Sequence, residues 1–432
     1  MSGAPSRKDP PSIGQEMYHL VAELFPICRS ITGNGVRQTL EILKRYIPLR
    51  VHEVCSGRRV FDWTVPQEWN IRDAYIMDEG GRKIVDFQQN NLHIVGYSTP
   101  VDAWMDLADL LPHLHSLPDQ PEAIPYVTSY YRSYWGFCLA DKVRRKMRPG
   151  RYRVVIDSDL KDGHLTYGEC LIPGRSRQEV FLSTYVCHPS MANNECSGPA
   201  VTTFLARWIA SAPRRYSYRI VFIPETIGSL TYLSRNLKAM KRNIIAGFNI
   251  SCVGDERVYS CLASRYGNTL ADRVSLNILT FRHPDFIRYS FLERDSDERQ
   301  YCSPGVDLPL VTITRSKYGT YPEYHTSLDD LDLVTAEGLS GSYELLIECL
   351  QLLERNAKYR VTCHGEPQLG RRGLYPTLSA GRSGRSARDI TNFIAYADGT
   401  NDLVDTSNII GVPVWDLYPI IEKLVEAGLI TS

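Results

Sequence analysis

Strand-like and helix-like runs alternate between residues 179 and 357, and this alternation limits the possible folds more than any other feature of the sequence. The strand-like runs are EVFLSTYVC, YRIVFIP and IIAGFNISCVG, and the helical runs are PAVTTFLARWIASA, GSLTYLSRNLKAM and GLSGSYELLIECLQLLERN. Strands that alternate with helices in this way form a largely parallel sheet with helices on both faces. The sequence therefore predicts an α/β domain whose functional loops lie beyond the carboxyl ends of the strands.

The residues before this region follow other patterns. Residues 14 to 46 carry apolar positions at helical spacing, which predicts two helices around the turn SITGNG. From about residue 50 to 175, short β-like runs are separated by Gly, Pro and Asp, which predicts a mostly β domain inserted into the α/β domain. Residues 1 to 13 are polar and contain proline, so we expect a disordered lead.

The segment from 358 to 432 has helical runs and ends in the turn EAGLI, which is typical of a winged-helix domain. Winged helices often bind DNA through phosphate contacts. Acidic and basic residues balance in this segment, and its last helical run is more acidic than basic. The basic run GRSGRSAR at 381 to 388 is expected as a short loop that could contact phosphate. The charge pattern favours a protein–protein or intramolecular docking module over nucleic-acid binding.

Charge and cysteine content limit the classes of partner. The 432 residues include 49 basic and 49 acidic side chains, which favours neither nucleic acid nor an anionic membrane as the main partner. There is no secretory h-region, and no apolar run reaches the roughly 18 residues that a membrane span needs. The 11 cysteines lack CxxC pairs. We therefore expect a cytoplasmic protein with reduced thiols and no membrane partner, in which a homodimer is plausible.

Candidate metal ligands stand at the ends of the predicted strands. His188 follows EVFLSTYVC, Glu225 follows YRIVFIP, Asp255 follows GFNISCVG, and His325 lies in YPEYHTSLDDLD. The carboxyl ends of parallel strands meet at one edge of a sheet, so these side chains are expected to converge. Two His and two carboxylates are a suitable ligand set for zinc or a similar metal.

Each of these residues also has a purely structural interpretation. A single His in a loop usually makes ordinary hydrogen bonds, and Glu225 or Asp255 could cap a following helix. The run Ser197-Gly198-Pro199 is a normal helix start. The presence of all four candidates at strand ends favours the metal site over these alternatives.

The order of the motifs resembles the zinc aminopeptidases of the bacterial leucyl aminopeptidase and glutamate carboxypeptidase type. The motifs are His188, NECSG at 194 to 198, ET at 225 to 226, VGD ending at Asp255, SDERQYCSPGVDLP at 296 to 309, and HTSLDD at 325 to 330. More closely, VPQEWNIRDAYI at 65 to 76 and YYRSYWGFC at 130 to 138 resemble a subfamily with an inserted domain and a C-terminal winged helix. Proteins of that type often accompany polysaccharide or specialised-metabolite biosynthesis.

The resemblance implies an architecture. It implies an aminopeptidase-like mixed sheet covered by helices, formed by residues 14–48 and 176–357. An inserted, mostly β domain is expected at 49–175, and a winged-helix-like domain at 358–432.

The resemblance also implies a set of ligands. His188, residue 194 and Asp255 would hold one metal, residues 194 and 226 with His325 a second, and Glu225 would be the general base. Here Asn194 stands where the family has a bridging Asp, and Thr226 where the peptidases have a second Glu. An amide is a poor bridge between two dications, so we expect one zinc ion rather than two, on His188, Asp255 and His325. The neighbouring Glu195 could reach the metal only if the turn shifts.

The expected function is metal-dependent hydrolysis of an amide or peptide bond in a small peptide-like or aminoacylated metabolite, within a biosynthetic pathway. Arg132 is expected to hold a substrate carboxylate, because Arg binds carboxylates bidentately. The other residues expected at the substrate are Tyr131, Asp297 and Tyr324. Two alternatives stay open: a catalytically degenerate binding or scaffold protein, which Asn194 favours, and a DNA-binding regulator, which the charge balance disfavours.

Overall fold

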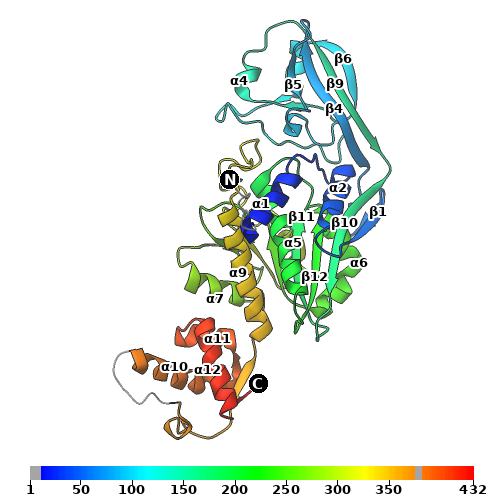
Figure 1. The fold of residues 1–432 in the computed structure, drawn as a ribbon. Coiled ribbons are helices and arrows are strands. Elements are labelled where there is room, and N and C mark those ends of the chain that lie inside the picture. The colour runs from blue at the N-terminus through cyan, green and yellow to red at the C-terminus, as the bar shows by residue number, and fades with distance from the viewer. Residues whose placement is uncertain (1–10, 375–381) are drawn as a thin grey trace, which may run out of the picture.

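The computed structural model describes residues 11–374 and 382–432 of the 432-residue chain. The first ten residues of the expected disordered lead lie outside this description. The chain forms an α/β body, a β-rich lobe above it and a small helical domain below it, in the orientation of Figure 1. The mixed α/β architecture with an inserted mostly β domain and a C-terminal winged helix agrees with the fold predicted from the sequence.

The α/β body is built on an eight-stranded mixed sheet. The strand order is β1 (Arg50–Cys55), β10 (His164–Ile172), β12 (Ser217–Ile223), β11 (Glu179–Tyr185), β13 (Ile244–Ile250), β16 (Leu310–Thr314), β14 (Ser260–Leu262) and β15 (Ile287–Tyr289). The four central strands β12, β11, β13 and β16 are parallel, as the alternation of strands and helices predicts. On one side the sheet is extended by β10, which is antiparallel to β12, and by β1, which is antiparallel to β10. On the other side β14 pairs antiparallel with β16.

Helices cover both faces of the sheet. The long ones are α1 (Ile13–Leu24), α2 (Asn34–Leu43), α5 (Ser197–Ala210), α6 (Ile227–Asn243), α7 (Leu270–Arg282) and α9 (Ala336–Arg355), and the short α8 spans Glu298–Tyr301. Side chains of β11 alternate between the two faces, so Leu182 joins the core under α5 and α9, whereas Phe181 joins the core under α6. Every residue of β11 is buried, as expected for a central strand covered on both faces.

The β-rich lobe contains fewer residues than the predicted segment 49–175, because two strands of that segment join the sheet of the body. Its main sheet has the order β5 (Lys83–Asp86), β4 (Glu68–Asp78), β9 (Arg151–Lys161) and β6 (Val101–Asp106). Its smaller elements are β2 (Arg59–Val60), β3 (Trp63–Thr64), α3 (Leu107–Leu110), β7 (Leu114–His115), β8 (Phe137–Cys138) and α4 (Asp141–Arg144). The strands β1 and β10 pair with each other and belong to the sheet of the body. An alternating pattern predicts a strand but does not say which sheet the strand joins.

The C-terminal domain is a winged helix. It contains β17 (Lys358–Val361), α10 (Arg382–Tyr396), β18 (Asp398–Asp402), α11 (Leu403–Ile410), α12 (Val414–Glu426) and β19 (Ile430–Thr431), with the sheet order β18-β17-β19. Arg273 on α7 forms ion pairs with Asp402 and Asp405, which fastens the domain to the body. The expected loop at 381–388 is wrong where the structure can test it, because residues 382–388 form the start of α10; residue 381 lies outside the description.

Two further predictions can be compared with the structure. All 11 cysteines are free thiols, as the absence of paired motifs indicates. No helix within residues 11–374 and 382–432 is both long and apolar enough to cross a bilayer.

Candidate functional site

His188 lies just beyond the carboxyl end of β11, buried at the centre of the site. Its Nδ1 is 3.0 Å from Glu195 Oε2, and its Nε2 is 3.8 Å from Glu225 Oε2. The ring centroid of His325 is 5.4 Å from that of His188, and the ring of Tyr126 from the inserted lobe lies beside both. Burial, with a smaller contribution from Arg29, lowers the pKa of His188 to about 3, so the imidazole is neutral.

Glu195 belongs to a turn of π-helix, residues Ala192–Cys196, that leads directly into α5. Its Oε1 lies 3.1 Å from Nε of Arg29, and both side chains are fully buried. Arg29 also donates to the backbone oxygens of His188 and Leu24, each at 2.8 Å. The ion pair thus ties the N-terminal segment to both sides of the His188 turn.

Glu225 and Thr226 join β12 to α6. Thr226 has a left-handed backbone with φ of 63°, and Asp297 accepts its N–H at 2.7 Å and the hydroxyl of Ser229 at 2.8 Å. Arg299 Nη2 donates to Thr226 Oγ1 at 2.6 Å. Burial and then the charge of Asp297 raise the pKa of Glu225 to about 8, although about a fifth of its side chain remains exposed to the pocket.

Asp255 lies in the loop after β13, and its carboxylate is fully engaged by protein donors. Oδ1 accepts the Arg257 N–H and the Ser316 hydroxyl, each at 2.9 Å. Oδ2 accepts the Ser316 N–H at 3.0 Å and Asn193 Nδ2 at 2.9 Å. Gly254 N–H donates to Asn193 Oδ1, which fixes the orientation of that amide. Asp255 therefore holds two loops together, and no lone pair is left over for a metal.

The turn that carries Asn194 is organised by Asp329. The Asp329 carboxylate accepts the N–H groups of Asn193 and Asn194 at 2.6 and 2.9 Å and the Tyr321 hydroxyl at 3.0 Å. Asn194 Nδ2 donates to the Tyr185 hydroxyl at 2.9 Å, whereas its Oδ1 is buried with no hydrogen-bond partner among the described residues. This turn is not a helix cap, because no side chain caps the N-terminus of α5.

His325 reaches the site from the loop after β16. Its ring stacks on Tyr324 at a centroid distance of 3.9 Å, and its backbone is left-handed with φ of 56°. Nε2 is buried and has no hydrogen-bond partner in the part of the chain that the structure describes. Burial, followed by the effect of His188, lowers the pKa of His325 to about 3, so this imidazole is also neutral.

A pocket of about 280 Å³ opens beside His188 and Glu225. Most of its lining is apolar or aromatic, and Thr226 and Arg299 complete the wall. The apolar and aromatic residues are Ile31, Trp63, Tyr130, Tyr131, Cys187 and Ile227. Tyr131, predicted at the substrate, thus lines the pocket. Asp297 does not line the pocket but accepts the N–H of Thr226, which does. Tyr324 stacks on His325 and does not line the pocket either. Arg132 is exposed, lies over the ring of Tyr134 and does not line the pocket.

Comparison with known proteins shows the family to which the chain belongs. The sequence profile of a family described as a domain of unknown function, DUF4910, matches residues 18–356. The chain belongs to the DUF4910 family. Residues 357–432, at the C-terminal end, match a winged helix-turn-helix family.

A relative from Clostridium acetobutylicum is 45% identical over 395 residues, which is 91% of this DUF4910 chain and 90% of the relative. That protein bears a provisional name that combines polysaccharide biosynthesis with an aminopeptidase-like domain. A crystal structure from the same organism, provisionally named a peptidase, is 42% identical with a TM-score of 0.92, covering 97% of this chain and 96% of that one.

The zinc aminopeptidase BSAP from Bacillus subtilis shares the fold of this DUF4910 protein. It is 12% identical with a TM-score of 0.57, over 80% of this chain and 96% of that one. The resemblance to zinc aminopeptidases predicted from the motifs is therefore confirmed at the level of the fold.

BSAP is named a zinc aminopeptidase, and two sets of side chains in this DUF4910 member are the candidates for holding such a metal. Donor atoms of Cys187, His188 and Glu195 lie within 4.8 Å of one another. This first set is a poor one, because Arg29 already pairs with Glu195 and burial raises the pKa of the Cys187 thiol well above its usual value. The second set is His188 Nε2, His325 Nε2 and Asn194 Oδ1.

The donor chemistry of the second set suits a metal, and the ring centroids of its two histidines are 5.4 Å apart. Both imidazoles are neutral, which is the metal-binding form, and two of the three donors are buried without a hydrogen-bond partner within the described residues. Sequence reasoning named these three residues but missed Arg29, Arg299 and Tyr126. An isolated Arg or Tyr carries no motif, so no signal in a single sequence identifies them.

Proposed function

We propose that this protein is a metal-dependent hydrolase of amide or peptide bonds in small, peptide-like or aminoacylated substrates. The observation that carries the proposal is the convergence of His188, Glu225 and the unpartnered His325 Nε2 beyond the strand ends of an aminopeptidase-like sheet. Such strand ends are where α/β folds bind their ligands. The small pocket beside Glu225 supports a small substrate.

One zinc ion would be held by His188, His325 and Asn194. When bound, zinc supplies Lewis acidity, which polarises a carbonyl group and makes a water molecule acidic near neutral pH. We do not propose a second ion. Thr226 stands at the position of a second-metal ligand, and its hydroxyl already accepts a hydrogen bond from the cationic Arg299. Asp255, with four protein donors on its carboxylate, acts as a positioning residue for the loops around the site.

Glu225 is proposed as the general base. Its carboxyl group is partly exposed to the pocket, and its pKa of about 8 allows it to accept and return a proton near neutral pH. It would take a proton from the attacking water and deliver it to the leaving amine. Trp63, Tyr130 and Tyr131 would cover the apolar part of the substrate and exclude bulk water. A biosynthetic role is supported by the name of the Clostridium acetobutylicum relative.

The test combines metal analysis with a substrate screen. Purified protein is analysed for bound metals and assayed against aminoacyl amides and short peptides, beside His325→Ala and Glu225→Gln. We expect zinc in the wild type, less zinc in His325→Ala, and zinc without turnover in Glu225→Gln. Wild-type protein that binds no metal even after incubation with zinc would contradict the proposal and favour a binding protein.

A further inference from the structure

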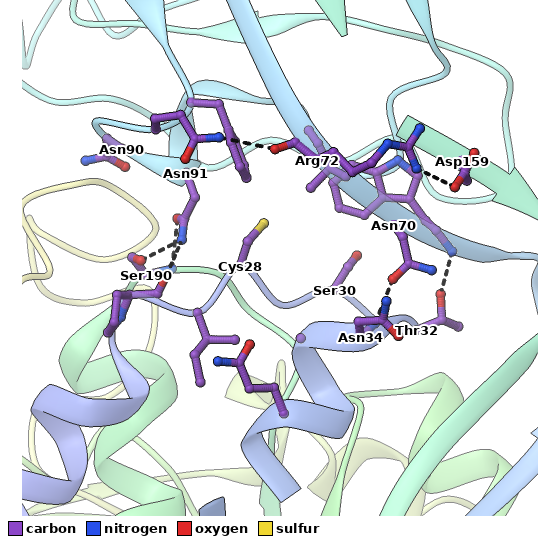
Figure 2. Close-up of a pocket in the computed structure, with 18 of the residues that line it drawn as sticks. Cys28, Ser30, Thr32, Asn34, Asn70, Arg72, Asn90, Asn91, Asp159 and Ser190 are labelled. Carbon is purple, nitrogen blue, oxygen red and sulfur yellow. Dashed lines mark hydrogen bonds and ion pairs between the residues drawn. The ribbon is translucent and has the colours of Figure 1, made fainter. Parts of the chain in front are cut away.

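A second and larger cavity lies between the α/β body and the inserted lobe (Figure 2). Its volume is about 900 Å³, within the usual range for sites of small molecules. The segment between α1 and α2 forms one side, and β4 together with the residues after β5 forms the other. In Figure 2 the side chains of Cys28 and Ser30 point into this space from the body.

This cavity is separate from the pocket beside Glu225, although the two share walls. Ser30 and Ser190 line the large cavity, whereas Ile31 and His188 line the small pocket. Asn91 also lines the large cavity, and its Nδ2 donates to Ser190 Oγ at 2.8 Å. A ligand in the large cavity would therefore lie next to the candidate active site without entering it.

Every charged side chain that lines the large cavity already has an ionic partner. Glu68 pairs with Arg37 at 2.7 Å, and Asp159 pairs with Arg72 at 2.5 Å and with Lys161 at 3.8 Å. The remaining one, Glu23, pairs with Arg45. An ionic ligand would have to compete with these pairs, so the lining offers no free charge that would select an anion or a cation.

The rest of the polar lining consists mainly of amides and hydroxyls. The amides of Gln38 and Gln89 make no hydrogen bond to other described residues, and Asn90 uses only its Oδ1, which accepts the Leu92 N–H. Each free amide offers two donors and one acceptor. Burial raises the pKa of the Cys28 thiol to about 12, so this group is neutral as well. Partly buried Phe25 and Phe87 add apolar surface.

We propose that this cavity binds a neutral, polyhydroxylated ligand of the class of an uncharged sugar. Hydroxyl groups both donate and accept, which matches amides that present both functions side by side. The C–H faces of a sugar ring suit the aromatic surfaces of Phe25 and Phe87. The absence of a free charge in the described lining disfavours sugar phosphates and amino sugars.

Saturation-transfer-difference NMR on the full chain tests the proposal. The neutral probes are glucose, N-acetylglucosamine and myo-inositol, and the charged counterparts are glucose 6-phosphate and glucosamine. At about 10 mM probe, which detects dissociation constants in the millimolar range, we expect saturation transfer to at least one neutral probe and little to its charged counterpart.

The double substitution Gln38→Leu with Gln89→Leu removes both free amides. Both side chains are exposed, so the fold is expected to survive. We expect the affinity for the neutral probe to fall by about tenfold, equivalent to about 1.4 kcal/mol. Gln178→Leu is the matched control, since Gln178 is exposed and does not line the cavity, and it should leave binding unchanged. No binding of any neutral probe, stronger binding of the charged ones, or equal affinity in the double variant would overturn the proposal.

Discussion

Arg29 and Glu195 form a buried ion pair, Nε to Oε1 at 3.1 Å, directly behind the candidate ligand His188. Removing one partner leaves an uncompensated buried charge, so Arg29→Met should lower the free energy of unfolding by about 3–5 kcal/mol. Urea denaturation measures this loss. The double variant Arg29→Met with Glu195→Leu should lose less, and exposed Arg257→Met, which breaks the pair with Glu323, should lose about 1 kcal/mol or less. Equal losses of unfolding free energy in the two Arg29 variants would show that an unpaired Glu195 charge is not the cause of the destabilisation.

Asp255→Asn separates a metal ligand from a positioning residue. The amide cannot accept all four hydrogen bonds that the carboxylate accepts, so stability should fall by about 1–3 kcal/mol. The zinc content, measured by elemental analysis, should stay at the wild-type level. Loss of zinc from folded Asp255→Asn would restore Asp255 to the ligand set expected from the sequence.

Glu225→Gln should abolish turnover while the protein keeps its zinc and its fold. The amide cannot accept a proton, and loss of a general base typically costs about 10²–10⁴ in rate. Steady-state kinetics on the best substrate from the screen, with zinc analysis in parallel, measure both effects. A variant that retains full activity would refute the assignment of the base.

Asn194→Asp should tighten zinc binding. The substitution places a charged oxygen where Asn194 Oδ1 is buried without a partner among the described residues, and carboxylate oxygens bind zinc well. Competition with a chelator at fixed pH measures the dissociation constant. If Asn194→Asp binds zinc no more tightly than the wild type, the amide oxygen does not face the metal.

The stability of the chain at low pH should depend on Glu68, which links α2 to β4. Hydrogen bonds from Arg37 are the main cause that lowers the pKa of Glu68 to about 2, against 4.5 for a free side chain. A lowered pKa means that this contribution is complete above pH 4.5 and is lost as the pH falls towards 2. Thermal unfolding between pH 7 and pH 3 should show a smaller loss on acidification in Glu68→Gln than in the wild type.

Much of the site could be predicted because strand ends are local in sequence and neighbours in space. The buried runs of β11 and β12 end just before His188 and Glu225, and parallel pairing of these strands brings the two side chains to 3.8 Å. His325 was also named from the sequence, although it lies in a polar loop rather than directly after one of the predicted strands. Which side chains are free to bind a metal was not predictable. Asp255 was expected to be a ligand, yet its carboxylate accepts hydrogen bonds from Ser316 and Asn193.

The sequence by itself determined the elements and their order, because hydrophobic periodicity and turn residues act over a few neighbouring positions. It determined the α/β body, the β-rich insertion and the winged helix in this way. Only the tertiary structure decided that β1 and β10 belong to the body, that Arg29 supports the His188 turn, and that an amide-lined cavity separates the inserted lobe from α2. These features depend on contacts between residues far apart in the chain, and a single sequence contains no record of which distant side chains meet.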